Sequence, residues 1–193
     1  MSFEVANYEL FKNALPRDVV DFLYIYTNTV REAVSVHVDN DIDFSHLGII
    51  KDREAELSFG KYKDPAMETL LKLCKPFVEN ATGLSLVETY SYYRVYSKGE
   101  TLRPHTDRPS CEISVTICLG GDPWDFIADN TDISMSSGDL IVYRGQEVMH
   151  YREEFKGNQC SQVFLHYNDL NGPHGDSNKY DKCEGLMVGK NYG

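Results

Sequence analysis

Residues 90–107, YSYYRVYSKGETLRPHTD, combine a strand-forming run with a pair of metal-binding side chains. The first seven residues are mostly aromatic or β-branched, which favours a β-strand, and Lys98-Gly99 is a turn signal that ends it. After the turn, His105 and Asp107 stand two positions apart. On an extended chain both side chains project to the same face, about 6.5–7 Å apart along the strand, and can reach one metal ion.

The chain downstream of residue 107 has the pattern of a series of short strands. Runs of strand-forming residues recur between glycine-marked turns, without a helical pattern between them. The expected strands are residues 111–119, 124–128, 139–143, 147–152 and 160–167. Short antiparallel strands in this order predict a barrel or jelly roll.

Upstream of these strands, residues 1–84 have the pattern of helices. One helix is expected to begin at Pro16-Arg17, because apolar residues then recur near the helical period. These apolar residues are Val19, Val20, Phe22, Leu23 and Ile25. A second helix is expected from Pro65, with Asp64 as its N-cap, to about Gly83. Its expected buried stripe is Met67, Leu70, Leu71, Leu73, Phe77 and Val78.

Two further segments complete the expected organisation. Residues 38–63 are polar with little periodicity, which predicts a loop, and residues 169–193 are rich in Gly, Asn and charge, which predicts a covering tail. We therefore expect an α+β protein, mainly β, in a single domain of residues 1–193. Its parts would be a helical flank (1–84), a jelly-roll core (85–168) and the tail.

Composition narrows the function classes. The chain has 193 residues, 41% of them hydrophobic, which suits one folded domain and excludes a disordered chain. A formal net charge of −11 argues against nucleic acid as a partner. The sequence has neither an apolar run of membrane-spanning length nor a signal-peptide pattern, so we expect no membrane association. Five cysteines without a CxxC pair predict reduced thiols and a cytoplasmic location.

A third metal ligand is expected from His150, which lies beyond the intervening strands. Two imidazoles and one carboxylate are the ligand set of the non-haem Fe(II) oxygenases. Zinc hydrolases also use His and carboxylate ligands, so the residue types leave the metal open. A second His-x-Asp triplet, His37-Val38-Asp39, lies in a polar, acidic stretch, which is more typical of a solvated loop.

Residues 92–168 resemble the catalytic core of the Fe(II)- and 2-oxoglutarate-dependent dioxygenases, in particular the prolyl 4-hydroxylase-like branch. The matching elements, in family order, are Tyr96, Gly99, Pro104-His105-Thr106-Asp107, Cys118-Leu119-Gly120, Pro123-Trp124, Gly138-Asp139-Leu140, His150, Gly157-Asn158 and Phe164-Leu165-His166-Tyr167. The resemblance implies a double-stranded β-helix, which is a jelly roll. It also implies His105, Asp107 and His150 as catalytic iron ligands, with Fe(II), 2-oxoglutarate and O₂ as cofactor and co-substrates.

The sequence departs from this family at the expected anchor for the far carboxylate of 2-oxoglutarate. The family usually has Lys or Arg nine or ten residues after the second His, where this chain has Gln159 and Cys160. Because a buried carboxylate without a cation is costly, another basic residue should serve. Arg152, which shares the His150 face of an extended strand, is the first candidate, and Arg94 is the second. Tyr96, whose family counterpart often donates a hydroxyl to the co-substrate, and Gln159 are further candidates.

These features predict an oxygenase that hydroxylates an unactivated C–H bond and releases succinate and CO₂. The expected substrate is a small molecule or a peptide, such as a prolyl residue. Two alternatives stay open: a non-catalytic jelly-roll binding module, and a metal enzyme with a different co-substrate. The oligomeric state cannot be inferred from the sequence.

Overall fold

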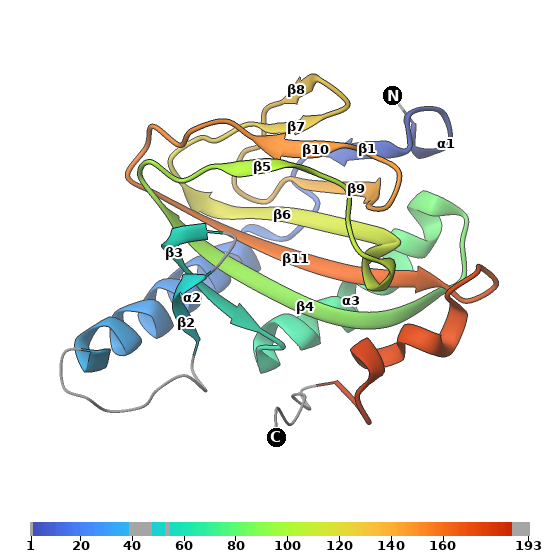
Figure 1. Cartoon of the computed structure of the whole chain (residues 1–193), viewed down its shortest axis with the longest axis horizontal. Helices are drawn as coiled ribbons and strands as arrows, with labels where there is room; N and C mark the ends of the chain where they lie inside the picture. The colour runs from blue at the N-terminus through green and yellow to red at the C-terminus, as the bar shows by residue number, and fades with distance from the viewer. Residues whose placement is uncertain (1, 39–47, 53–54, 187–193) are drawn as a thin grey trace.

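The computed structural model describes residues 2–38, 48–52 and 55–186, which form two antiparallel β-sheets and a layer of helices (Figure 1). The larger sheet has the strand order β1-β9-β6-β11-β4-β3-β2, and the smaller has β5-β10-β7-β8. The larger sheet comprises β1 (Tyr8–Phe11), β2 (Ile49–Asp52), β3 (Ala55–Tyr62), β4 (Leu86–Ser97), β6 (Ile113–Gly121), β9 (Leu140–Arg144) and β11 (Gln159–Asp169). The smaller sheet comprises β5 (Leu102–His105), β7 (Phe126–Ala128), β8 (Thr131–Ile133) and β10 (His150–Arg152).

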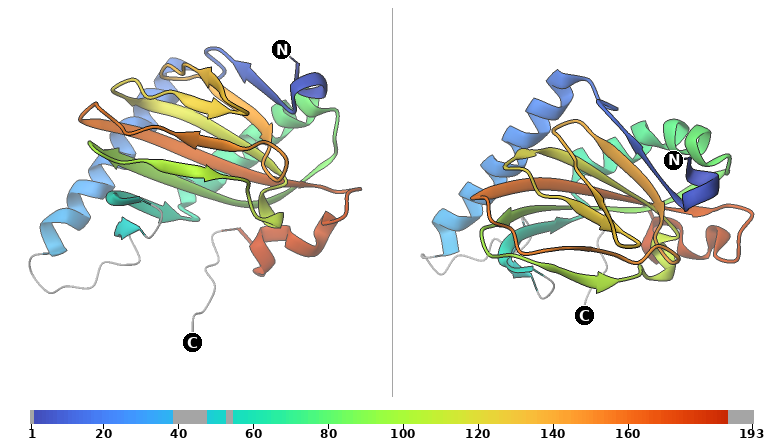
Figure 2. Two further views of the ribbon diagram at one scale, coloured as in Figure 1. Left: turned by 45° about the horizontal axis from the view of Figure 1, so that its top comes forward. Right: turned by 90° about the horizontal axis from the view of Figure 1, so that it is seen from above.

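Helices α2 (Arg17–Val38) and α3 (Pro65–Thr82) cover one face of the larger sheet, and the smaller sheet lies over the other face (Figure 2). The helical elements are α1 (Phe3–Ala6), α2 (Arg17–Val38), α3 (Pro65–Thr82) and the 3₁₀ helices η2 (Pro109–Cys111) and η3 (Gly175–Lys182). The result is the jelly-roll arrangement, mainly β with flanking helices, that the sequence predicts.

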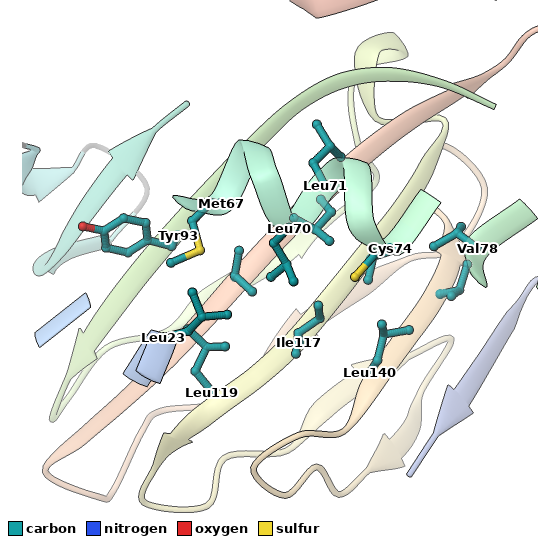
Figure 3. Packing of buried hydrophobic residues seen from close by; sticks show 14 of the residues in the cluster. Leu23, Met67, Leu70, Leu71, Cys74, Val78, Tyr93, Ile117, Leu119 and Leu140 are labelled. Atoms are coloured by element: carbon teal, nitrogen blue, oxygen red, sulfur yellow. The ribbon is translucent and has the colours of Figure 1, made fainter. Parts of the chain in front are cut away.

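Strand alternation gives the molecule two separate cores. On β4, Tyr93 and Val95 face the helices, whereas Tyr92 and Tyr96 face the smaller sheet. Figure 3 shows the helix-side core, in which α3 side chains pack on the larger sheet. The side chains labelled there are Leu23, Met67, Leu70, Leu71, Cys74, Val78, Tyr93, Ile117, Leu119 and Leu140. The second core fills the space between the sheets with residues such as Phe126, Ile141 and Tyr143.

The expected limits of α3 are confirmed by its capping groups. Asp64 accepts a hydrogen bond from the backbone N–H of Ala66, and Pro65 occupies the first helical turn. Gly83 ends the helix at φ 71°, a left-handed conformation that favours glycine.

The expected buried stripes are only partly correct. Leu73 is 65% exposed and Phe77 38% exposed on α3, while Phe22 and Ile25 are 61% and 64% exposed on α2. A helix that packs on a sheet buries one stripe, and these four apolar side chains lie beyond it. The remaining members of the α3 stripe, and Val20 and Leu23 of α2, are buried as expected.

The prediction that residues 38–63 form a loop is wrong for the parts that the structure describes, because β2 and β3 lie there. β3 is polar and weakly periodic, and it forms because β4 provides a hydrogen-bonding partner, pairing Phe59 with Val95 and Tyr62 with Tyr92. The short strands β1, β5 and β8 were also not expected. Asp39 and residues 40–47 lie outside the described residues.

Among the described residues, no helix is both long and apolar enough to cross a bilayer.

Candidate functional site

Antiparallel pairing of β5 with β10 brings His105 directly opposite His150. Their ring centroids are 4.3 Å apart. Asp107 follows β5, and its Oδ1 atom lies 3.7 Å from Nε2 of His105 and 3.6 Å from Nε2 of His150. The three side chains predicted from sequence therefore meet with their ligand atoms within 4.8 Å of one another, a spacing suitable for one metal ion.

Both histidines are oriented by backbone carbonyls. Nδ1 of His105 lies 2.8 Å from the carbonyl oxygen of Arg103, and Nδ1 of His150 lies 3.0 Å from that of Val148. Because a carbonyl only accepts, each Nδ1 carries the proton and each Nε2 keeps its lone pair for a metal. Burial lowers the pKa of His150 to about 4, so this imidazole is neutral near pH 7.

Ser114 and Gly145 hold the carboxylate of Asp107 in place. The Ser114 hydroxyl donates to Oδ2 of Asp107 at 2.6 Å, which leaves Oδ1 toward the histidines. The backbone N–H of Asp107 donates to the carbonyl of Gly145 at 2.7 Å. A Cβ atom at position 145 would lie 2.4 Å from Oδ2, so this close approach requires glycine.

The buried side chain of His166 forms a hydrogen bond with the Ser114 hydroxyl. Nδ1 of His166 lies 3.0 Å from the Ser114 hydroxyl oxygen. The hydroxyl has one proton, which goes to the charged carboxylate, so His166 is the donor in this second bond. Burial lowers the pKa of His166 to about 4, which keeps its ring neutral, and the ring packs 4.5 Å from that of Tyr90.

The sequence analysis missed Ser114, Gly145 and His166 as site residues. A signal was present for the first: in Ile113-Ser114-Val115-Thr116, hydroxyl and apolar side chains alternate, which indicates two different faces of one strand. What lies opposite the hydroxyl face depends on sheet pairing, which the alternation does not specify.

The side chains of His105, Asp107 and His150 open into a cavity of about 760 Å³ between the two sheets. Three of the four expected anchor residues, Arg152, Arg94 and Tyr96, line this cavity, and Gln159 does not. The Gln159 amide instead donates to the side chains of Asn28 and Tyr24 on α2.

Arg152 is a buried cation that binds no carboxylate among the described residues. It is 2% exposed, and its guanidinium lies 5.0 Å from the ring of Trp124. Nη1 donates to the backbone carbonyl of Trp124, whereas Nη2 has no hydrogen-bond partner in the described part of the chain. Among the described residues, neither Glu153 nor Glu154 forms an ion pair with it, and Glu154 pairs with Lys156.

Tyr96 and Arg94 stand on the cavity face of β4. The Tyr96 hydroxyl is buried and has no hydrogen-bond partner among the described residues. Its ring meets Trp124 edge-on at 4.9 Å. Arg94 is 7% exposed, with its guanidinium 5.0 Å from the ring of Tyr92. Cys160, the other residue at the family's anchor position, pairs with Tyr96 across β4 and β11 and is fully buried.

Comparison with known proteins defines the fold further. No protein-family model and no curated protein matches the sequence. A prolyl-4-hydroxylase from Pseudomonas putida is similar in structure, with a TM-score of 0.60 and 15% identity over 85% of this chain and 94% of that one. A viral collagen prolyl hydroxylase from Paramecium bursaria Chlorella virus-1, in complex with 2-oxoglutarate, has a TM-score of 0.58 and 11% identity over 85% and 97%.

A third similar structure is HygX from Streptomyces hygroscopicus with nickel and 2-oxoglutarate bound. It has a TM-score of 0.61 and 10% identity over 88% of this chain and 85% of that one. These similarities show that the chain has the jelly-roll fold of the 2-oxoglutarate- and Fe(II)-dependent oxygenases, as the resemblance in its sequence implied.

Proposed function

We propose that the protein is an Fe(II)- and 2-oxoglutarate-dependent oxygenase that hydroxylates an unactivated C–H bond. The observation that carries this proposal is the presence, in one cavity, of a His-Asp-His cluster and a buried arginine without a carboxylate partner among the described residues. The first suits a divalent metal ion, and the second suits an anionic ligand beside it.

The donor set fits iron. His105, His150 and Asp107 supply two neutral imidazole nitrogens and one carboxylate oxygen, the set used by non-haem Fe(II) oxygenases, which leave further coordination positions to ligands. The carbonyl and hydroxyl partners of these side chains hold them in ligating orientations before the metal binds.

Arg152 and Tyr96 fit the far carboxylate of 2-oxoglutarate. Nη2 of Arg152 and the hydroxyl of Tyr96 are both buried donors without a partner among the described residues, and leaving such donors unpaired is costly. A carboxylate would accept from both, and an arginine–carboxylate bond is among the stronger hydrogen bonds in proteins. Arg94 would add positive charge to the same part of the cavity. Gln159 is not part of this proposal, since its amide is engaged with α2.

In this reaction the chain would bind the metal, orient the co-substrate and exclude water from the cavity. His105, Asp107 and His150 would hold the metal, and Arg152 and Tyr96 would bind the far carboxylate of the co-substrate. Phe126, Tyr143 and Phe164 form apolar walls that limit water in the cavity. When bound, the metal, 2-oxoglutarate and O₂ supply the oxidising chemistry, with release of succinate and CO₂.

The proposed substrate is a small molecule or a peptide. Two of the similar structures are prolyl hydroxylases, and HygX has also been solved with hygromycin B, so this fold serves both substrate classes. We further propose that residues 1–193 act as one oxygenase domain in the cytoplasm, which the five free cysteines support.

An anaerobic titration tests the proposal. Apo protein receives Fe(II) and then 2-oxoglutarate, and the visible charge-transfer band of the iron chelate is recorded. We expect a band for the wild type and none for Asp107→Ala. Arg152→Gln should retain Fe(II) binding and bind 2-oxoglutarate at least tenfold more weakly. Arg103→Gln is the matched control, because Arg103 is exposed and is not among the residues that line the cavity.

Fe(II) binding by the wild type without the band would contradict the assignment of 2-oxoglutarate. It would favour a different co-substrate or a non-catalytic binding module. A full band in Arg152→Gln would instead move the anchor to Arg94.

A further inference from the structure

Besides Arg94 and Arg152, the cavity is lined by a third arginine, Arg108, which directly follows Asp107. Its Nη1 and Nη2 donate to the two carboxylate oxygens of Asp181 at 2.9 and 3.1 Å. The Tyr62 hydroxyl donates to the same carboxylate. Nη1 of Arg108 also donates to the Ser110 hydroxyl at 3.3 Å. These groups form a complete binding site for one carboxylate at the edge of the proposed metal site.

The chemistry of this site suits a carboxylate. The planar guanidinium presents two parallel donors, which match the two oxygens of a carboxylate. The guanidinium is held over the ring of Tyr90 at 4.7 Å, which orients it. Burial by itself would raise the pKa of Asp181, but the bonds from Arg108 and Tyr62 hold that pKa well below its usual value, so the occupant is an anion.

The carboxylate bound to Arg108 comes from Asp181, in the protein's own C-terminal segment. Asp181 belongs to η3, which packs against β4 (Figure 1), and it is 2% exposed. Tyr180, Asp181 and Lys182 have φ angles of 51°, 53° and 63°, so three consecutive non-glycine residues adopt the left-handed conformation. Side-chain-bearing residues disfavour this region, and the surrounding contacts must hold the segment in it.

Arg108 and Arg152 each closely follow a member of the His105, Asp107 and His150 cluster along the chain. Arg152 lies two residues beyond His150 and Arg108 one residue beyond Asp107, and both line the same cavity. Because 2-oxoglutarate is assigned to Arg152, Arg108 remains for the substrate. A ligand whose carboxylate sat on Arg108 would share this cavity with His105, Asp107 and His150.

We propose that Arg108, Tyr62 and Ser110 form a subsite for a carboxylate group of the substrate, and that Asp181 occupies this subsite in the resting protein. The substrate class is thus a carboxylate-bearing small molecule or an acidic peptide. The claim that the ligand is the substrate rests on the proposed function. The claim that a carboxylate binds here rests only on the contacts of Arg108, Tyr62 and Ser110. An internal carboxylate competes at high effective concentration, so external carboxylates bind the wild type weakly.

Isothermal titration of metal-free protein with N-acetylglycine tests the subsite, and the neutral N-acetylglycinamide serves as the matched probe. We expect Asp181→Ala to bind N-acetylglycine at least tenfold more tightly than the wild type, without a gain for the amide. Asp176→Ala is the control, because it removes an exposed carboxylate from the same segment. The double variant Asp181→Ala/Arg108→Gln should lose the gain.

Equal affinity of wild type and Asp181→Ala, an equal gain for the amide, or a gain that survives in the double variant would each overturn the proposal. Should Asp181→Ala not fold, as judged by circular dichroism, Asp181→Asn keeps the side-chain volume and should show the same direction of change. Failure of both variants to fold would assign Asp181 a purely structural role and would also overturn it. Since the titration uses neither iron nor 2-oxoglutarate, its result is separate from that of the charge-transfer experiment.

Discussion

Ser114 shows how a residue outside the proposed metal-ligand set controls the geometry of that set. Its hydroxyl takes one oxygen of Asp107 and leaves the other toward His105 and His150. His166 fixes the hydroxyl in turn. Since outer partners of this kind orient metal ligands, the bond between Ser114 and Asp107 should contribute to metal affinity.

Replacing Ser114 with alanine should weaken Fe(II) binding by about 10- to 100-fold, because Asp107 would lose its orienting donor. Anaerobic equilibrium titration with Fe(II) measures the dissociation constant. Thr116→Val is the matched control: it removes the next buried hydroxyl on the same face of β6, which the structure places near Tyr143. Equal weakening in both variants would mean that general packing, and not the bond to Asp107, is responsible.

At the scale of elements, Asp139 joins the start of β9 to the segment after β1. Its carboxylate accepts from the backbone N–H of Asn13 at 3.0 Å and of Ser136 at 2.7 Å. It also pairs with Lys12 at 2.9 Å. These bonds connect the end of β1, a strand at the edge of the larger sheet, to the start of β9, with which β1 pairs. The sequence analysis matched Asp139 to the family pattern, and its role here is structural.

The Asp139→Ala variant should lower the free energy of unfolding by about 3 kcal/mol, since it leaves backbone donors without partners. Urea denaturation measures the change. Asp21→Ala removes one partner of an exposed ion pair with Arg17 on α2 and should cost less than about 0.5 kcal/mol. Similar losses in the two variants would show that Asp139 does not join these elements.

At the scale of the whole molecule, an acidic protein encloses a cavity with three arginines. The formal net charge of the chain is −11, yet Arg94, Arg108 and Arg152 line one cavity with two carboxylates, those of Asp107 and Asp181. Anionic ligands are repelled by the surface in general and attracted at this one place, so charge contributes to selectivity. Both the proposed co-substrate and the proposed substrate are anions of this kind.

Two buried neutral histidines should also make the stability of the metal-free protein depend on pH. Burial lowers the pKa values of His150 and His166 to about 4, below the ordinary 6.5. Between these values the unfolded chain binds more protons, so stability is lost as the pH falls from about 6.5 toward 4. Each histidine contributes up to about 1.4 kcal/mol per pH unit.

Urea denaturation at pH 7, 6 and 5 measures this slope. His166→Gln should reduce it by about half, because one of the two protonating groups is removed. Parallel stability curves for wild type and variant would contradict a buried, neutral His166.

Local sequence was sufficient for much of the architecture. The strand-forming residues 90–96, the glycine-marked strands after them and the capping residues Asp64 and Gly83 predicted the jelly roll and α3 correctly, because each reports on backbone geometry within a few residues. The resemblance to a known family pointed to His105, Asp107 and His150, which the pairing of β5 with β10 brings together.

Contacts between segments that are distant in the sequence determined the remaining features of the fold and of the site. Strand β3 forms because β4 lies beside it, and Ser114 and His166 meet Asp107 because β6, β11 and the segment after β5 converge in space. Arg108 binds Asp181 across a sequence separation of 73 residues, and Gln159 turns to α2 and not to the cavity. Such contacts depend on sheet register and layer stacking, and no pattern within a short window of sequence specifies them.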